Sequence, residues 1–267
     1  LIRGLDDEDQ QSLRSEVVEI LKGVYSANER WDDWSAMLEQ ELQQADDKWA
    51  QLDILSRLAL NQEQVQADYE LALSSWVRAY RIDYGNADIR VELERLSEAT
   101  DAWSLLIGAY EDGLEDYDDA DGVIDTLYRL FELYADKLND ESNAIVSLRR
   151  IVDLDDSQTK AMDLLLERLD PETDRSLLIE IAEHRAHHCD DPDKRMNLFV
   201  LCADLSEGQD EQVAQAAEYI SLARQDNSES IELVERLISL LERQKDWTAV
   251  AERLSERLEM AGDTADR

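Results

Sequence analysis

The sequence predicts an all-α protein built from stacked helical pairs, and three observations support this prediction. Only 2 Pro and 8 Gly interrupt the 267 residues, so turn signals are too few for a β-sandwich or a β-barrel. The chain is rich in Leu, Ala, Glu, Gln and Arg, which favour helices, and its hydrophobic fraction of 43% is too high for disorder. One sequence pattern recurs with a period near 34 residues, the length of a helix-turn-helix unit.

The recurring pattern emerges when segments of the chain are compared. The segments after Trp34, Trp103, Arg175 and Trp247 resemble one another, and a second kind of segment lies between them, most clearly at 128–156. Aligning the two kinds gives one equivalent residue in each unit, which we call the reference positions: Met37, Ala72, Leu106, Ala144, Leu178, Ala216 and Val250. Their separations are 35, 34, 38, 34, 38 and 34 residues, so about seven units occupy residues 18–264.

The segment 124–138 shows how such a unit forms a helix. One apolar stripe has the alternating spacing of three and four residues that marks one helix face: Ile124, Leu127, Phe131, Tyr134 and Leu138. Leu130 and Leu133 begin a second apolar stripe. Two stripes predict a helix that packs between two neighbours, as in a solenoid.

Helix starts are predicted where a side chain that accepts a hydrogen bond precedes an apolar pattern. Both prolines follow an aspartate, as Asp170-Pro171 and Asp191-Pro192, and Pro at the first helical position favours a helix start. Four further residues can cap helices by accepting a backbone N–H: Asp140, Ser157, Ser228 and Asp246.

The units resemble those of the tetratricopeptide repeat (TPR) family. That family has large apolar residues on the first helix of each unit, matched here by Val234, Leu237, Ile238 and Leu241. Its second helix has a small residue followed by apolar ones, matched here by Ala144, Leu148 and Ile151. The resemblance implies a right-handed superhelical α-solenoid with one continuous domain over residues 18–267, after a lead-in segment at 1–17. It also implies a scaffold whose first helices line a concave groove that binds a peptide or a partner helix.

The resemblance assigns the groove positions residue by residue. They are Arg57, Asn61, Arg95, Arg129, Leu130, Leu133, Lys160, Asp163, Glu167, Leu198, Leu201 and Leu205. The Lys, Arg and Asn cluster that grips a C-terminal carboxylate in chaperone-binding TPR proteins is missing from any two adjacent units. The segment 196–205 is apolar on nearly every face, so it is either buried all round or exposes a strip for a partner helix.

The charge of the chain bounds its partners. With 27 Lys+Arg against 64 Asp+Glu, the net charge is −37 at pH 7, which repels phosphate backbones and anionic lipids. We therefore expect a neutral or basic protein or peptide partner, with no nucleic acid and no membrane insertion; the oligomeric state stays open. Such acidity is typical of proteins from salt-loving organisms and equally of ordinary acidic soluble proteins.

Two cation sites are weighed as alternatives to a scaffold. His184, His187 and His188 could share a helix face and hold a divalent metal such as Zn or Ni, although Cys202 lies too far from Cys189 to complete a site. The alternative is that these histidines lie in the last turn of a helix, where cationic or polar side chains interact favourably with the helix dipole. The acidic run at 111–125 partly fits a calcium loop, with Asp119 and Asp121 at ligand positions, but Tyr117 and Tyr128 replace two required ligands. Solvated carboxylates in a loop are the simpler interpretation.

No catalytic motif is found, so we expect neither an enzyme nor a cofactor. No stretch approaches the roughly 20 apolar residues that a membrane span needs. The chain begins Leu1-Ile2 without an initiator Met or a signal peptide, and its end at 261–267 lacks a capping helix. We expect a soluble protein, with the cytoplasm favoured, that is a fragment of a longer chain.

Overall fold

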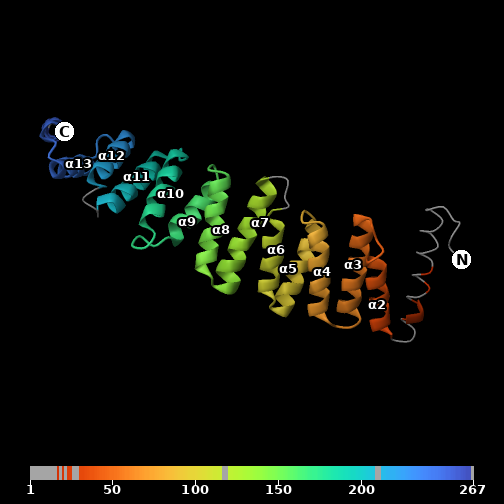
Figure 1. Cartoon of the computed structure of the whole chain (residues 1–267). Helices are drawn as coiled ribbons and strands as arrows, with labels where there is room; N and C mark the ends of the chain where they lie inside the picture. Colours follow the sequence, from red (N-terminus) through yellow and green to blue (C-terminus); the bar gives the residue numbers. More distant parts are fainter. Residues whose placement is uncertain are drawn as a thin grey trace. The chain divides into compact units, whose positions relative to one another are not determined.

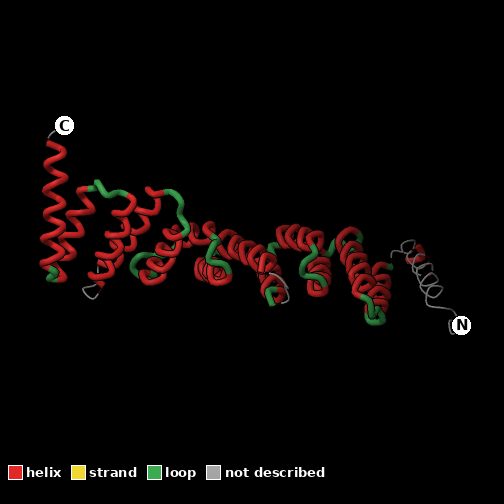
Figure 2. The backbone as a smooth tube through the Cα atoms, turned by 90° about the horizontal axis from the view of Figure 1, so that it is seen from above, coloured by secondary structure: helices red, strands yellow, loops and turns green. Residues whose placement is uncertain are grey.

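The computed structural model describes residues 30–115, 120–207 and 212–265, together with positions 17, 20 and 23–25; for 261–265 it describes the backbone alone. Within these residues every regular element is a helix, so the predicted all-α class is confirmed (Figure 2). None of the described helices is long and apolar enough to cross a membrane. The chain divides into two compact units, residues 1–126 and 127–267.

The first unit consists of helical neighbours in chain order (Figure 1). Its helices are α2 (Trp31–Leu42), α3 (Lys48–Gln64), α4 (Tyr69–Ile82), α5 (Ala87–Thr100) and α6 (Trp103–Gly113). Each packs against the next along the chain, and α4 also contacts α6. Leucines at the centre of these contacts are fully buried, among them Leu38, Leu58, Leu73 and Leu93. The unit therefore buries its core between successive helices, as stacked repeats do.

The second unit follows the same scheme after α7 (Ala120–Glu132), which crosses the boundary between the units. Its elements are a π-helical segment η1 (Leu133–Leu138), then α8 (Glu141–Leu154), α9 (Thr159–Arg168), α10 (Arg175–His187), α11 (Pro192–Glu207), α12 (Val213–Asp226), α13 (Ile231–Gln244) and α14 (Trp247–Ala265). From α8 to α14 each helix contacts its neighbour in the chain. The predicted single helix over 124–138 is thus an α-helix that widens into a π-helical turn.

The reference positions recur at one place in the structure. From Ala72 onward, each is the fourth residue of an even-numbered helix, and each is buried. Met37 is the exception: it is half-buried on α2. The even-numbered helices are therefore the second helices of the predicted units, and the odd-numbered helices are the first.

The turn between the two helices of a unit is also repeated. Ala67, Asp101, Asn139 and Lys245 have positive φ values between 52° and 61°, and each lies five residues before a reference position. Each follows an odd-numbered helix or its π-helical extension. A left-handed residue at this place ends one helix and redirects the chain into the next.

Three of the predicted helix starts are confirmed and three are wrong. Carboxylates of Asp140, Asp191 and Asp246 accept backbone N–H groups at the starts of α8, α11 and α14. By contrast, Asp170 accepts from the N–H groups of residues 172 and 173 and forms a turn, so α10 begins later, at residue 175. Ser157 donates to Asp155 instead of capping a helix, and residue 230, two after Ser228, caps α13. The side chains of Asp170 and Ser157 thus form local hydrogen bonds in turns instead of capping a helix.

Candidate functional site

The predicted groove residues of α3 are held by neighbours within the chain. Arg57 forms ion pairs with Glu41 at 3.4 Å and with Asp53 at 3.1 Å. Asn61 is buried, and its amide donates to the Ser35 hydroxyl of α2 at 3.1 Å. These polar side chains therefore connect α3 to the helix before it.

Arg95 of α5 behaves in the same way. Its guanidinium binds the Glu63 carboxylate of α3 through two nitrogens, at 2.8 and 2.7 Å, and it also binds Glu92. Hydrogen bonds to these two carboxylates raise the pKa of Arg95 above its usual range. Arg95 thus joins the odd-numbered helix α5 to the odd-numbered helix α3.

In the second unit, the predicted residues of α7 and η1 face inward. Leu130 and Leu133 are buried, and Arg129 is half-buried. Lys160 of α9 is exposed, and its ammonium lies 4.6 Å from the centroid of the Tyr128 ring, within the range of a cation–π contact. This contact connects α9 to α7. Lys160 is therefore accessible to solvent, with its ammonium held against the Tyr128 ring.

The acidic candidates of α9 are exposed. Asp163 binds Arg185 of α10 at 2.6 Å, and this hydrogen bond raises the pKa of Arg185. Glu167, one turn further along α9, is exposed to solvent. Together they give this odd-numbered helix a negative outer face.

The apolar candidates of α11 are divided between core and surface. Leu205 is buried, as are Phe199 and Cys202. Leu198 and Leu201, three residues apart on one face, are half-buried. The segment 196–205 thus contributes to the core and also leaves a partly accessible pair of leucines.

The histidines do not form a metal site. All three are exposed; Nδ1 of His188 lies 3.0 Å from the carbonyl oxygen of His184, and the His187 ring packs edge-on against Phe199. Among the residues that the structure describes, no group of three or more His, Cys, Asp or Glu side chains could hold a metal ion. The divalent-metal alternative therefore has no supporting arrangement in this part of the chain.

The acidic run lies partly outside the described residues, which omit Tyr117 and Asp119. Asp125, at its end, pairs with Arg90 of α5 at 2.7 Å. Asp121 is exposed near the start of α7. The described carboxylates of this run therefore face solvent or a neighbouring helix.

Two hollows lie on the even-numbered helices, a surface that the sequence did not single out. Hollow 1, of about 460 Å³, is lined chiefly by α10 with one residue of α12: Ile179, Glu180, Glu183, His184, His187 and Gln215. Hollow 2, of about 710 Å³, lies among α12, α13 and α14 and is lined in part by Ala217, Leu222, Arg224, Leu237, Leu241 and Ala249. The regular spacing of the reference positions could have indicated this surface, because residues that line the two hollows lie at the same offsets from Leu178 and Ala216.

A polar link spans α10 and α12 beside hollow 1. The Tyr219 hydroxyl donates to the Glu183 carboxylate at 2.8 Å and accepts from the Gln215 amide at 3.0 Å. Burial, together with the Glu183 carboxylate, raises the pKa of Tyr219. The link holds Glu183 at the edge of the hollow.

Comparisons with known proteins find solved structures only, since no family model and no curated protein matches the chain. MamA from Desulfovibrio magneticus RS-1 is 15% identical over 81% of this chain and 97% of that chain, with a TM-score of 0.33. YrrB, described as a TPR protein, is 16% identical over 68% and 90%, with a TM-score of 0.34. A TPR protein from Parabacteroides merdae is 15% identical over 92% of both chains, with a TM-score of 0.32.

TPR proteins are structural neighbours of this chain. These neighbours are consistent with the resemblance noted in the sequence. At such low identity and TM-score they carry no argument about function.

Proposed function

We propose that this chain is a non-catalytic scaffold that binds a neutral or basic segment of another protein along its odd-numbered helices. The observation that supports this best is the half-buried pair Leu198 and Leu201 on α11. Partly exposed leucines one helical turn apart are the kind of anchor that an amphipathic partner helix meets. The proposed binding residues are those of the second unit that remain accessible: Lys160, Asp163, Glu167, Leu198 and Leu201.

The charges around these leucines favour a basic partner. The odd-numbered helix before α11 exposes Glu167, and the one after it exposes Glu232. Asp163 and Glu235 on these helices are also exposed, although they already bind Arg185 and Arg257. A segment with apolar anchors and Lys or Arg on its flanks would therefore be complementary to this surface. The net charge of −37 would speed the encounter with such a segment and disfavour nucleic acids.

The charged residues of the first unit contribute differently. Arg57 and Arg95 are paired within the chain, so a partner would have to compete with existing carboxylates for them. We therefore assign these two arginines to the rigidity of the scaffold. Leu133 and Leu205 are buried and support the surface from beneath, whereas Arg129 is half-buried.

The test is selection from a phage-displayed library of random peptides against the whole chain. We expect selected peptides to combine apolar residues with Lys or Arg, to weaken as salt is raised, and to lose binding to Leu201→Glu. The matched control is Leu60→Glu, which adds the same charge at an exposed leucine of α3. Peptides that bind Leu201→Glu and the wild type equally, at all salt concentrations, would overturn the proposal.

A further inference from the structure

Hollow 1 and hollow 2 are the same groove in successive repeats. Their linings coincide when α10 and α12 are aligned on Leu178 and Ala216: Glu180 corresponds to Glu218, and His184 to Leu222. Gln215, which closes hollow 1, likewise corresponds to a hollow 2 residue on α14. One groove thus follows the even-numbered helices α10, α12 and α14, and residues of α13 complete hollow 2.

In the first unit, the carboxylate that corresponds to Glu180 is bound by an arginine of the chain itself. Glu39 lies two residues after the reference position of α2, and Arg78 six residues after that of α4. Arg78 binds both oxygens of Glu39, at 2.5 and 2.9 Å, and this pairing lowers the pKa of Glu39. The chain itself therefore shows that a guanidinium fits at this place.

On α10 the residue that corresponds to Glu39 is Glu180, and on α12 the residue that corresponds to Arg78 is Leu222. Leucine cannot pair with a carboxylate, and neither Glu180 nor Glu183 has a cationic partner in the described part of the chain. Instead, hollow 1 opens beside them. The groove thus presents two carboxylates where an earlier repeat holds an arginine.

Hollow 2 has a different character. Leu222, Leu237 and Leu241 give it an apolar wall, and alanines and the charged side chains of Glu218 and Arg253 also line it. Arg224 also lines it; the side chain of Arg224 is only 10% exposed, and its Nε has no hydrogen-bond acceptor. An apolar side chain of a ligand fits this wall.

We propose that this groove binds an extended segment of a partner protein, with an arginine side chain in hollow 1 and a large apolar side chain in hollow 2. Packed helices lie about 8–10 Å apart, which is the smallest separation of two even-numbered helices, and an extended chain advances about 3.3 Å per residue. The two anchors are therefore at least about three residues apart in the partner. Arginine is preferred to lysine because its planar fork can meet carboxylate oxygens in pairs, as Arg78 does.

A second copy of the chain is a poor occupant by comparison. Each copy has a net charge of −37, so two copies repel each other, and most described arginines are already paired within the chain. A basic segment of another protein is attracted by the same charge. Charge complementarity therefore favours a basic segment of another protein over a second copy of the chain as the occupant of the groove.

The experiment uses fluorescein-labelled peptides and the whole chain, with fluorescence anisotropy as the readout. Each peptide carries one Arg and one Leu in a Ser/Gly background, in both orders and at varied spacing. We expect tightest binding at one spacing of about three residues or more, and roughly tenfold weaker binding when citrulline, a neutral isostere, replaces Arg. Equal binding of the arginine and citrulline peptides would refute the proposal.

Protein variants locate the site. Glu180→Gln with Glu183→Gln should weaken the arginine peptide roughly tenfold, whereas the control Glu70→Gln with Glu98→Gln makes the same charge change at exposed places and should leave binding within about twofold. Equal losses in both variants would mean general charge attraction and would overturn the proposal. Leu201→Glu should not affect these peptides, so failure of the proposed function and failure of this inference remain distinguishable.

A third variant places the missing arginine in the chain. Leu222→Arg should pair with Glu180 in the manner of Arg78 with Glu39 and exclude the peptide arginine. Leu222→Gln is its control, since it removes the leucine but leaves the carboxylates unpaired; it should therefore keep discriminating arginine from citrulline. Circular dichroism verifies folding of both variants. If Leu222→Arg folds and still prefers arginine over citrulline as the wild type does, the arginine site is elsewhere.

Discussion

Arg78 of α4 and Glu39 of α2 join the second helices of two successive repeats through two hydrogen bonds, at 2.5 and 2.9 Å. The same kind of link recurs along the chain, since Arg81 binds Asp112 of α6 and Arg224 binds Glu256 of α14. Each arginine thus reaches the equivalent helix of a neighbouring unit: Arg78 that of the unit before, and Arg81 and Arg224 that of the unit after. Much of the positive charge in this acidic chain therefore holds repeats together.

The Arg78–Glu39 pair is expected to stabilise the fold by roughly 0.5 kcal/mol, because both side chains are about 40% exposed and solvent screens them. A double-mutant cycle with Arg78→Gln and Glu39→Gln, followed by urea unfolding, measures this coupling. Arg78 lowers the pKa of Glu39, so the coupling is present above pH 4.5 and is lost as pH falls through the lowered folded value. A coupling that persists fully in acid would contradict the assignment.

Ala67 lies in the turn between α3 and α4 with a φ of 55°, a left-handed conformation that strains L residues but not glycine. The side chain is exposed, so removing it loses little packing. We expect Ala67→Gly to raise the free energy of unfolding by roughly 0.5 kcal/mol, once the added freedom of the unfolded chain is included.

The control for this prediction is Ala72→Gly. Ala72 is fully buried inside α4, so there glycine should lower stability by roughly 1 kcal/mol. Urea midpoints of the two variants compare the effects directly. A loss of stability in Ala67→Gly would mean that this left-handed turn does not strain the chain.

The repeat pattern made most of the fold predictable. The period located Ala72, Ala144 and Ala216, and each proved to be a buried fourth residue of its helix, because stacked repeats bury the equivalent position of each unit against its neighbours. The π-helical turn at Leu133–Leu138 and the start of α10 after Pro171 were missed. Both depend on which of several close-lying hydrogen bonds forms, and sequence spacing does not determine that choice.

The candidate site was predicted less well, for a similar reason. The resemblance placed Arg57 and Arg95 in a groove, but their carboxylate partners come from other helices and could not be inferred from spacing within one helix. The hollows on the even-numbered helices were not anticipated either. Glu180 and Leu222 become informative only when compared with Glu39 and Arg78, whose contact the structure provides.

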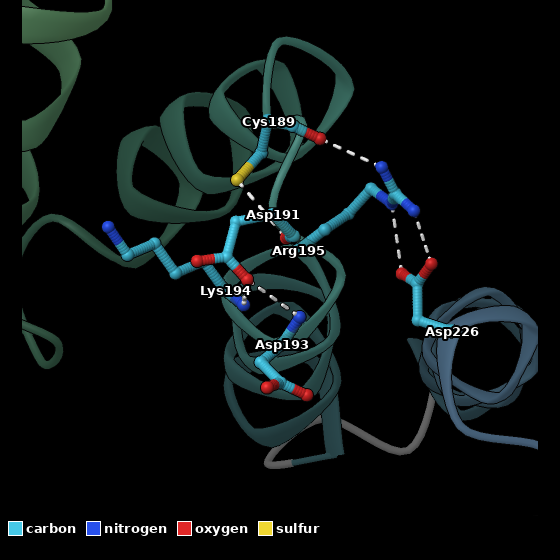
Figure 3. A network of polar contacts seen from close by, with 6 residues as sticks. All are labelled: Cys189, Asp191, Asp193, Lys194, Arg195 and Asp226. Atoms are coloured by element: carbon cyan, nitrogen blue, oxygen red, sulfur yellow. Dashed lines mark hydrogen bonds and ion pairs between the residues drawn. The ribbon is translucent and has the colours of Figure 1, made fainter.

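Arg195 connects three segments of the second unit, and its removal should destabilise them together (Figure 3). Its Nη1 donates to the carbonyl oxygen of Cys189 at 2.8 Å, and its Nε donates to Asp226, at the end of α12, at 2.9 Å. The Asp226 side chain is only 8% exposed, so Arg195→Gln leaves a poorly hydrated carboxylate without its cation. We expect a lower thermal midpoint and faster hydrogen exchange at the end of α12.

An exposed ion pair provides the control for Arg195. Arg30 binds Asp33 at 2.6 Å, but the two side chains are 60% and 48% exposed. Arg30→Gln should therefore leave the thermal midpoint nearly unchanged. Equal losses in the two variants would show that burial of Asp226 does not determine the effect.

Cys202 of α11 should make the fold less stable in alkali. Its side chain is fully buried, and burial, aided by the charge of Glu183, raises the pKa of the thiol from 9.0 to about 12. The unfolded chain releases this proton near pH 9, whereas the folded chain retains it until about pH 12. Stability contributed by the protonated thiol is therefore complete below pH 9 and is lost as pH rises through that interval.

The measurement compares urea midpoints from pH 7 to 10 in a Cys189→Ser background, so that Cys202 is the remaining thiol. Cys202→Ala should flatten the decline above pH 9. Tyr219→Phe separates the tyrosine contribution, because burial raises the pKa of Tyr219 as well. In the same background, a thiol reagent at pH 8 should label the native protein at least roughly a hundredfold more slowly than the unfolded chain. Equal labelling rates would mean that Cys202 is reached without unfolding, and the predicted alkaline decline would then lose its basis.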